Sequence, residues 1–134
     1  MTSLQRVLRL QAALWAVLGV SLAAAPGWVV ESLGGQPPSA PVWIRSVGLA
    51  DFVLALLMVL VSRRIDDVWW WSWAFVMLQA GTAATFALYA VFDLPPGASP
   101  WFWWALVAVH AVVGALELVG LARAGQEQPL VGSP

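Results

Sequence analysis

WFWWALVAVHAVVGALELVGLAR, residues 101 to 123, is the stretch that decides the fold of this chain. Its only ionisable side chains before the closing arginine are His110 and Glu117. A helix rises about 1.5 Å per residue, so this stretch is long enough to cross a hydrocarbon core of roughly 30 Å. Because His110 and Glu117 are seven residues apart, they share one helical face, and that face must point at other helices rather than at lipid.

The composition of the chain points to a bilayer rather than water as its solvent. Of 134 residues, 61% are hydrophobic and 10% are charged, whereas a soluble domain has roughly 25% charged residues. The absence of cysteine excludes disulfides and cysteine-ligated metals, and a single histidine excludes bis-histidine haem ligation by this chain alone. We therefore expect no metal and no cofactor. Basic patches that would bind nucleic acid are absent from the sequence.

Four apolar stretches predict an all-α membrane protein, a bundle of four transmembrane helices. The expected spans are about 6–25, 42–61, 68–92 and 101–123. Together they form one domain, residues 1–124, followed by a flexible tail over 125–134 that is rich in Gly and Pro. The first span also has the basic start and alanine-rich end of a secretory signal. The three spans that follow it favour a retained helix.

The connectors carry clear boundaries. PGWVVESLGG, residues 26–35, has a proline where a helix can begin and two glycines where it must stop. It is too short to span, so we expect a short interfacial helix between the first two spans. QPPSAP at 36–41 predicts a stiff link, and SRRIDD at 62–67 a short charged turn. Small residues at helical spacing (Ala12, Ala16, Gly19 and Ala23) favour close helix packing.

The positions of the arginines predict the orientation. Five arginines flank one side of the predicted bundle, and only Arg45 flanks the other: the five are Arg6, Arg9, Arg63, Arg64 and Arg123. The positive-inside rule then places both termini in the cytoplasm and the proline-rich connectors outside. The high content of Ala, Gly, Pro and Trp and the lack of lysine suggest a bacterial source, so we expect a multi-pass protein of the bacterial cytoplasmic (inner) membrane.

The tryptophan cluster WWWSW, residues 69–73, admits two interpretations. Tryptophan concentrates at membrane interfaces because its ring is amphipathic, which predicts an interfacial belt. An aromatic cage for a ligand cation is the alternative. The belt is the interpretation we favour.

Asp51 and His110 are the candidate functional pair. Each lies ten residues after the last proline of a similar connector, PPSAPVW at 37–43 and PPGASPW at 95–101. These connectors suggest a parallel internal repeat, with chance similarity as the alternative. Both side chains would lie about 12–13 Å below the tryptophan that opens their helix. Isolated charge in hydrocarbon is costly, so we predict that the two face each other, with Thr82 at similar depth as a hydroxyl partner.

Other polar groups are assigned supporting roles. Gln79, Thr82 and Tyr89 give the third span a polar side that should face protein. Arg45 can extend its side chain to the interface. Arg9 and Glu117 lie at depths of about 22 and 24 Å from the outer ends of their helices, which predicts a structural ion pair that closes the bundle.

WIRSVGLAD, residues 43–51, and the two-hairpin layout resemble the DoxX-like four-helix bacterial membrane proteins. That family has an arginine and a glycine near the start of its second helix, which match Arg45 and Gly48 here. The small multidrug-resistance exporters are similar in size and tryptophan content. Their hallmark is a glutamate embedded in the first helix, and residues 10–25 contain no acid.

The sequence favours a non-enzymatic accessory subunit that packs against other integral membrane proteins, for example in a lipid transporter or a respiratory complex. Its small-residue faces and sparse buried charge are typical of helix association. No catalytic residue is assigned. The alternative is a small proton-linked binding or transport protein that acts as a homo-oligomer on a hydrophobic or cationic molecule near Asp51 and His110. An intramembrane enzyme that uses these two residues as acid and base is a third hypothesis. Membrane lipids surround the protein in every case.

Overall fold

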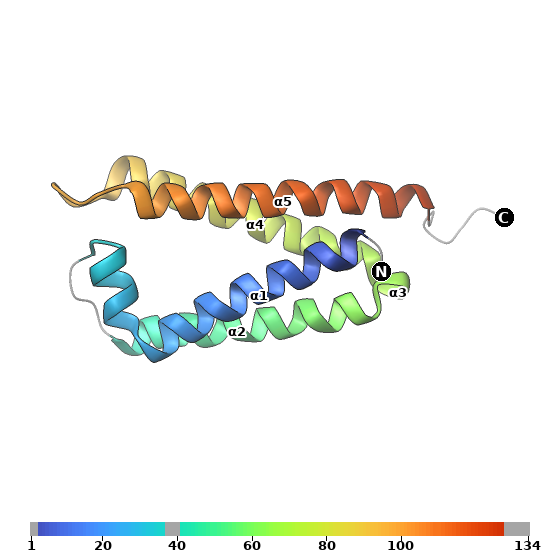
Figure 1. Cartoon of the computed structure of the whole chain (residues 1–134), viewed down its shortest axis with the longest axis horizontal. Coiled ribbons are helices and arrows are strands. Elements are labelled where there is room, and N and C mark those ends of the chain that lie inside the picture. Colours follow the sequence, from blue (N-terminus) through green and yellow to red (C-terminus); the bar gives the residue numbers. More distant parts are fainter. Residues whose placement is uncertain (1–2, 37–40, 128–134) are drawn as a thin grey trace.

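The computed structural model describes residues 3–36 and 41–127, and all regular structure in these ranges is helical (Figure 1). The predicted all-helical class is confirmed. The elements are α1 (Ser3–Ala24), the π-helix η1 (Trp28–Leu33), α2 (Pro41–Arg63), α3 (Ile65–Val68), the 3-10 helix η2 (Trp69–Trp71), α4 (Ser72–Leu88), the π-helix η3 (Tyr89–Asp93) and α5 (Trp101–Glu127).

Four stretches are long and apolar enough to cross a membrane, as predicted. They are α1, α2, the composite segment Ile65–Asp93 that runs from α3 to η3, and α5 as far as Gln126. Their length and composition are those of a multi-pass membrane protein. α5 extends beyond the predicted end of the span at Arg123 and into the expected tail. Gly125 alone does not end it, and the rest of the tail, residues 128–134, lies outside the described residues.

The four long helices form two hairpins. α1 packs along α2, α4 packs along α5, and the contact of α1 with α5 joins the hairpins. Ser3 and Glu127 lie at the same end as α3, and the connectors after α1 and α4 lie at the opposite end (Figure 1). Both hairpins therefore run in the same direction. Away from the α3 end, the two hairpins diverge in Figure 1, and η1 folds back into the space between them.

The apolar core fills the half of the bundle next to α3. Leu4 and Leu8 on α1, Met58 on α2 and Leu121 on α5 are all at most 2% exposed. Gly120 lets α5 approach α1 closely, since a Cβ there would lie 3.1 Å from the Cα of Leu4. Close packing near α3 therefore sets the directions in which the helices run from that end. The half of the bundle away from α3 is less tightly packed and contains a cavity.

Gly19 and Gly48 bring α1 and α2 into backbone contact. A Cβ on Gly19 would lie 2.6 Å from the carbonyl oxygen of Gly48, and a Cβ on Gly48 would lie 2.6 Å from that of Gly19. The predicted small-residue face of α1 is thus used at Gly19 within the chain. Close approach of backbones across small residues is a common form of packing between membrane helices.

The predicted turn over residues 62–67 is shorter in the structure. α2 continues to Arg63 and α3 begins at Ile65, so only Arg64 leaves the helical conformation, with φ −119° and ψ 33°. Gln5 of α1 explains part of this, because its amide nitrogen donates to the carbonyl oxygen of Ser62 at 2.8 Å. The last carbonyls of a helix need such donors, and a side chain from α1 supplies one here.

The expected helix over 26–35 is present as η1, and two contacts tie its end to the second hairpin. Trp103 Nε1 donates to the carbonyl oxygen of Gly34 at 2.9 Å, and Gln36 Nε2 donates to the hydroxyl of Tyr89. Gly35 has a φ of +66°, which glycine adopts without strain. Residues 37–40 of the predicted stiff link lie outside the described residues.

Exposed tryptophans mark both ends of the bundle. Trp28, Trp43 and Trp101 lie near the connector end, and Trp70 and Trp71 near the α3 end; all are at least 48% exposed. Two such rings of tryptophan, one helix length apart, are the arrangement of an interfacial belt. The exposure of Trp70 and Trp71 favours the belt over the cage.

Candidate functional site

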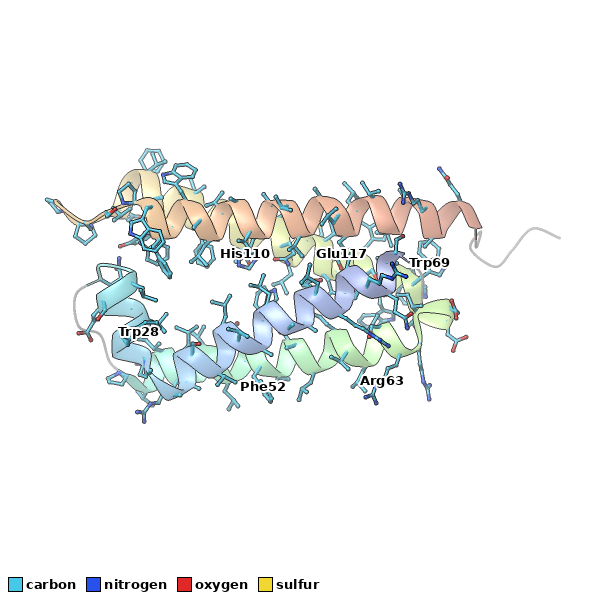
Figure 2. All side chains as sticks on the ribbon, in the orientation of Figure 1. Trp28, Phe52, Arg63, Trp69, His110 and Glu117 are labelled. Atoms are coloured by element: carbon cyan, nitrogen blue, oxygen red, sulfur yellow. The ribbon has the colours of Figure 1, made fainter. Side chains whose placement is uncertain are left out.

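A chain of buried polar side chains crosses the centre of the bundle. Gln11 of α1, Gln79 of α4, and His110 and Glu117 of α5 are each at most 1% exposed. Both α5 residues lie on the side of the helix that faces the α1–α2 hairpin (Figure 2). Buried polar groups in a membrane must find partners inside the protein, and these residues find them in one another.

The hydrogen bonds along this row of polar side chains, called the polar chain below, share one donor-to-acceptor direction. The Gln11 amide nitrogen donates to both Glu117 carboxyl oxygens, at 3.1 and 3.2 Å, and its oxygen accepts from Gln79 Nε2 at 3.2 Å. Gln79 Oε1 contacts His110 Nδ1. The Gln11 orientation is assigned from its neighbours, since the opposite one would turn its oxygen towards the carboxyl oxygens. The chain therefore runs from imidazole to amide to amide to carboxylate.

These amide orientations place a hydrogen on one ring nitrogen of His110. An amide oxygen only accepts, so the Nδ1 that contacts it must carry the hydrogen. In a neutral imidazole the other nitrogen, Nε2, is then an acceptor. In the part of the chain that the structure describes, neither His110 Nε2 nor the indole nitrogen of Trp15 has a hydrogen-bond partner, although both are buried.

Helical spacing places these side chains. Leu8, Gln11 and Trp15 lie three and four residues apart on the buried face of α1. His110 and Glu117 share the corresponding face of α5. Gly114 lies between them, and a Cβ there would lie 3.1 Å from the Cβ of Gln79. The missing side chain at Gly114 makes room for the Gln79 amide between α4 and α5.

A cavity of about 290 Å³ adjoins His110 in the half of the bundle where the hairpins diverge. Its wall is mostly apolar and aromatic. The His110 ring packs between Trp15, at 5.8 Å between centroids, and Phe86, at 5.6 Å. The lining residues are Trp15, Leu18, Leu22, Val29, Val30, Val47, Asp51, Thr82, Phe86, Phe102, Trp103, Leu106 and His110.

The structure brings the predicted pair to the same space. Asp51, Thr82 and His110 all line this cavity, from α2, α4 and α5. Asp51 is partly exposed and His110 is buried. The Nδ1 of His110 bonds to Gln79, so the side of the ring that remains for Asp51 or a ligand is Nε2. Direct pairing of Asp51 with His110 stays a prediction.

The other predicted groups are more scattered. Tyr89 bonds to Gln36 and stacks with Trp103 at 4.5 Å, so it holds the connectors together. Arg45 is exposed on α2. Gln79 belongs to the polar chain itself. Arg9 is exposed, whereas Glu117 is fully buried.

Gln11 of α1 contacts Glu117 in the structure, and the predicted ion pair of Arg9 with Glu117 stays a prediction. Arg9 and Gln11 are separated by two positions, about 200° around the helix, so they lie on nearly opposite faces. Depth alone suggested Arg9, and depth takes no account of this rotation. The signal for Gln11 was its place in line with Leu4, Leu8 and Trp15, since an amide within a membrane span is itself a sign of helix contact.

Within residues 3–36 and 41–127, no group of three or more His, Cys, Asp or Glu side chains could hold a metal ion. The chain matches no family model, and no curated protein or solved structure shows significant similarity to it. The resemblance to DoxX-like proteins therefore stays a prediction, and the function is argued from the cavity and the polar chain.

Proposed function

We propose that this protein is a small integral membrane protein that binds a hydrophobic molecule in the cavity between its two hairpins, with the polar end of that molecule at His110 and Asp51. The observation that carries the proposal is the cavity itself. Ligand sites are concave, mostly apolar and contain a few convergent polar groups, with volumes of roughly 300–1,000 Å³. The volume of this cavity, about 290 Å³, lies just below that range.

The surroundings of the cavity support a ligand that enters from the bilayer. Val30, Leu22 and Leu106 supply apolar walls, while Asp51 and Thr82 are the polar groups on the opposite helices. Ionisable groups within membrane spans are rare and mark binding sites or proton pathways more often than chance placement. No catalytic residue is assigned in this proposal, because binding needs only these groups.

A cavity-blocking substitution tests this proposal. Leu106→Trp should fill the cavity and abolish saturable labelling of Leu18 and Leu22 by an uncharged octyl diazirine, read by mass spectrometry in nanodiscs. Leu116→Trp is the matched control, because Leu116 lies on the same helix, is 47% exposed and does not line the cavity. It should leave the labelling unchanged. Labelling that rises linearly with probe and is insensitive to Leu106→Trp would contradict a binding cavity.

The proposal also covers the membrane in which the protein lies and its orientation there. We infer a bacterial inner-membrane location with both termini in the cytoplasm, supported by the asymmetry of the arginines. A cysteine introduced by Gly97→Cys in the connector before α5 should react with an impermeant thiol reagent added to intact cells. Gly97 has open space around it, its φ of +86° makes the cysteine locally strained, and no native cysteine competes. Reaction only after permeabilisation would reverse the orientation.

A second candidate, the accessory subunit, is favoured by a groove on the outer side of α4 and α5. Small residues line it, among them Ala80, Ala83, Ala111 and Ala115. Such surfaces let a helix of another membrane protein, or of a second copy, approach closely. Stoichiometric recovery of one unrelated membrane protein in mild detergent, lost on Ala83→Leu, would favour this candidate. A purified monomer that still binds the diazirine would favour the first.

A further inference from the structure

Resting on the proposed function, we infer that the cavity selects a lipophilic amine in its protonated form, held through its N–H groups by His110 and Asp51. The cavity would select for two properties of the ligand: a positive charge, and an N–H group on the charged nitrogen that can donate a hydrogen bond. Each part follows from a different feature of the site.

The polar chain leaves His110, which lines the cavity, with Nε2 as an acceptor. Its Nδ1 donates to Gln79 in the amide orientations assigned above. Nε2 remains as a buried lone pair without a partner. Gln11, Gln79 and Glu117 do not line the cavity, so they act as positioning residues. A ligand that meets this nitrogen must donate a hydrogen bond.

Asp51 supplies the preference for positive charge. Of the described residues that line the cavity, only Asp51 and His110 are ionisable, and no lysine or arginine is among them. A carboxylate in hydrocarbon is costly when it is alone. A ligand cation offsets that cost, whereas an anionic ligand would add to it.

The aromatic wall suits the same ligand. Trp15, Phe86, Phe102 and Trp103 line the cavity around His110. The faces of aromatic rings attract cations, most strongly where water is excluded. The apolar residues Leu18, Leu22 and Val30 can accommodate an alkyl chain.

The competing ligand is a neutral alcohol. The indole nitrogen of Trp15 is a donor without a partner, and a hydroxyl could accept from it while donating to His110. The alcohol leaves Asp51 without a counter-charge, and for this reason the amine is the ligand we infer. A quaternary ammonium is the second informative comparison, because it has the charge and lacks the N–H.

Three probes of one chain length separate these contributions. Octylamine, 1-octanol and octyltrimethylammonium compete with the octyl diazirine for labelling of Leu18 and Leu22 in the purified, full-length protein. Octylamine should compete at a concentration at least roughly tenfold lower than either of the others, the ratio expected from one hydrogen bond to a charged group. The wild-type ratios alone test the inference, so the test does not depend on any variant folding.

Two variants and one control variant then assign the charge and the hydrogen bond to individual residues. Asp51→Asn should abolish the advantage of octylamine over 1-octanol, and Glu31→Gln, which removes an exposed carboxylate outside the cavity, should not. Gln79→Leu should reduce the advantage of octylamine over the quaternary ammonium, because His110 is then free to present an N–H. Retention of the advantage over 1-octanol in Asp51→Asn, or of the advantage over the quaternary ammonium in Gln79→Leu, would overturn the inferred role of that residue.

Other outcomes are equally decisive. If 1-octanol competes best, or if all three probes compete alike, the inferred ligand class is wrong, while saturable diazirine labelling would still support a binding cavity. If the diazirine does not label the cavity saturably at all, the proposed function itself fails.

Discussion

Replacing Gln11 with leucine should destabilise the protein by about 1–3 kcal/mol, the cost of leaving a buried polar group without its partner. Gln11 is the one residue that contacts both Glu117 and Gln79 in the polar chain. Ordinary hydrogen bonds between membrane helices contribute only about 0.6 kcal/mol on average. A loss in this range would therefore mean that the buried Glu117 carboxyl group depends on the Gln11 amide. The free energy of unfolding in mixed micelles measures it.

A second substitution distinguishes this cause from lost packing. In the Gln11→Leu background, Glu117→Met removes the carboxylate that has lost its donor, so the double variant should regain much of the stability. Removal of both partners of a buried polar contact can be nearly neutral, whereas removal of one is costly. Additive losses in the two single variants and the double variant would show that Gln11 and Glu117 are not coupled.

Gly48→Ala should destabilise the α1–α2 hairpin by about 1–3 kcal/mol, as overpacking in a tight interface does. The added methyl group would lie 2.6 Å from the carbonyl oxygen of Gly19 and 2.7 Å from the backbone nitrogen of Ala23. Both contacts are with backbone atoms, which cannot rotate away. α1 must move, and Gln11 and Trp15 move with it.

Gly81→Ala is the matched control for this effect. Gly81 is also within a long helix, and a Cβ there meets nothing within 4 Å. The change should be neutral or stabilise by up to about 1 kcal/mol, because alanine favours helix more than glycine does. Equal losses at Gly48 and Gly81 would mean that the contact between α1 and α2 is looser than the structure has it. Thermal unfolding in detergent makes the comparison.

The helices and their order could be predicted because the length and composition of each apolar stretch identify it as a helix that can span a membrane. Four long apolar stretches separated by prolines and charged residues leave few alternatives in a chain of 134 residues. The shared depth of Asp51 and His110 could also be predicted, since depth follows from helical rise. The structure places both at one cavity.

The contacts of the polar chain could not be predicted in the same way. Depth does not say which face of a helix points inward, so it did not identify Gln11 as a partner of Glu117. The cavity depends on how far the two hairpins diverge. That divergence is set by backbone contacts such as Gly19 with Gly48 and Gly120 with Leu4, and no hydrophobic pattern specifies it.

The inferred selection of a protonated amine depends on an unprotonated Nε2 of His110. The chain has one histidine, so nitrogen-15 NMR of histidine-labelled protein in nanodiscs reports this ring alone, without assignment. We expect a neutral ring with the hydrogen on Nδ1 and none on Nε2, and loss of that single tautomer in Gln79→Leu. A hydrogen on Nε2 in the ligand-free protein, in a neutral ring or an imidazolium, would contradict the account.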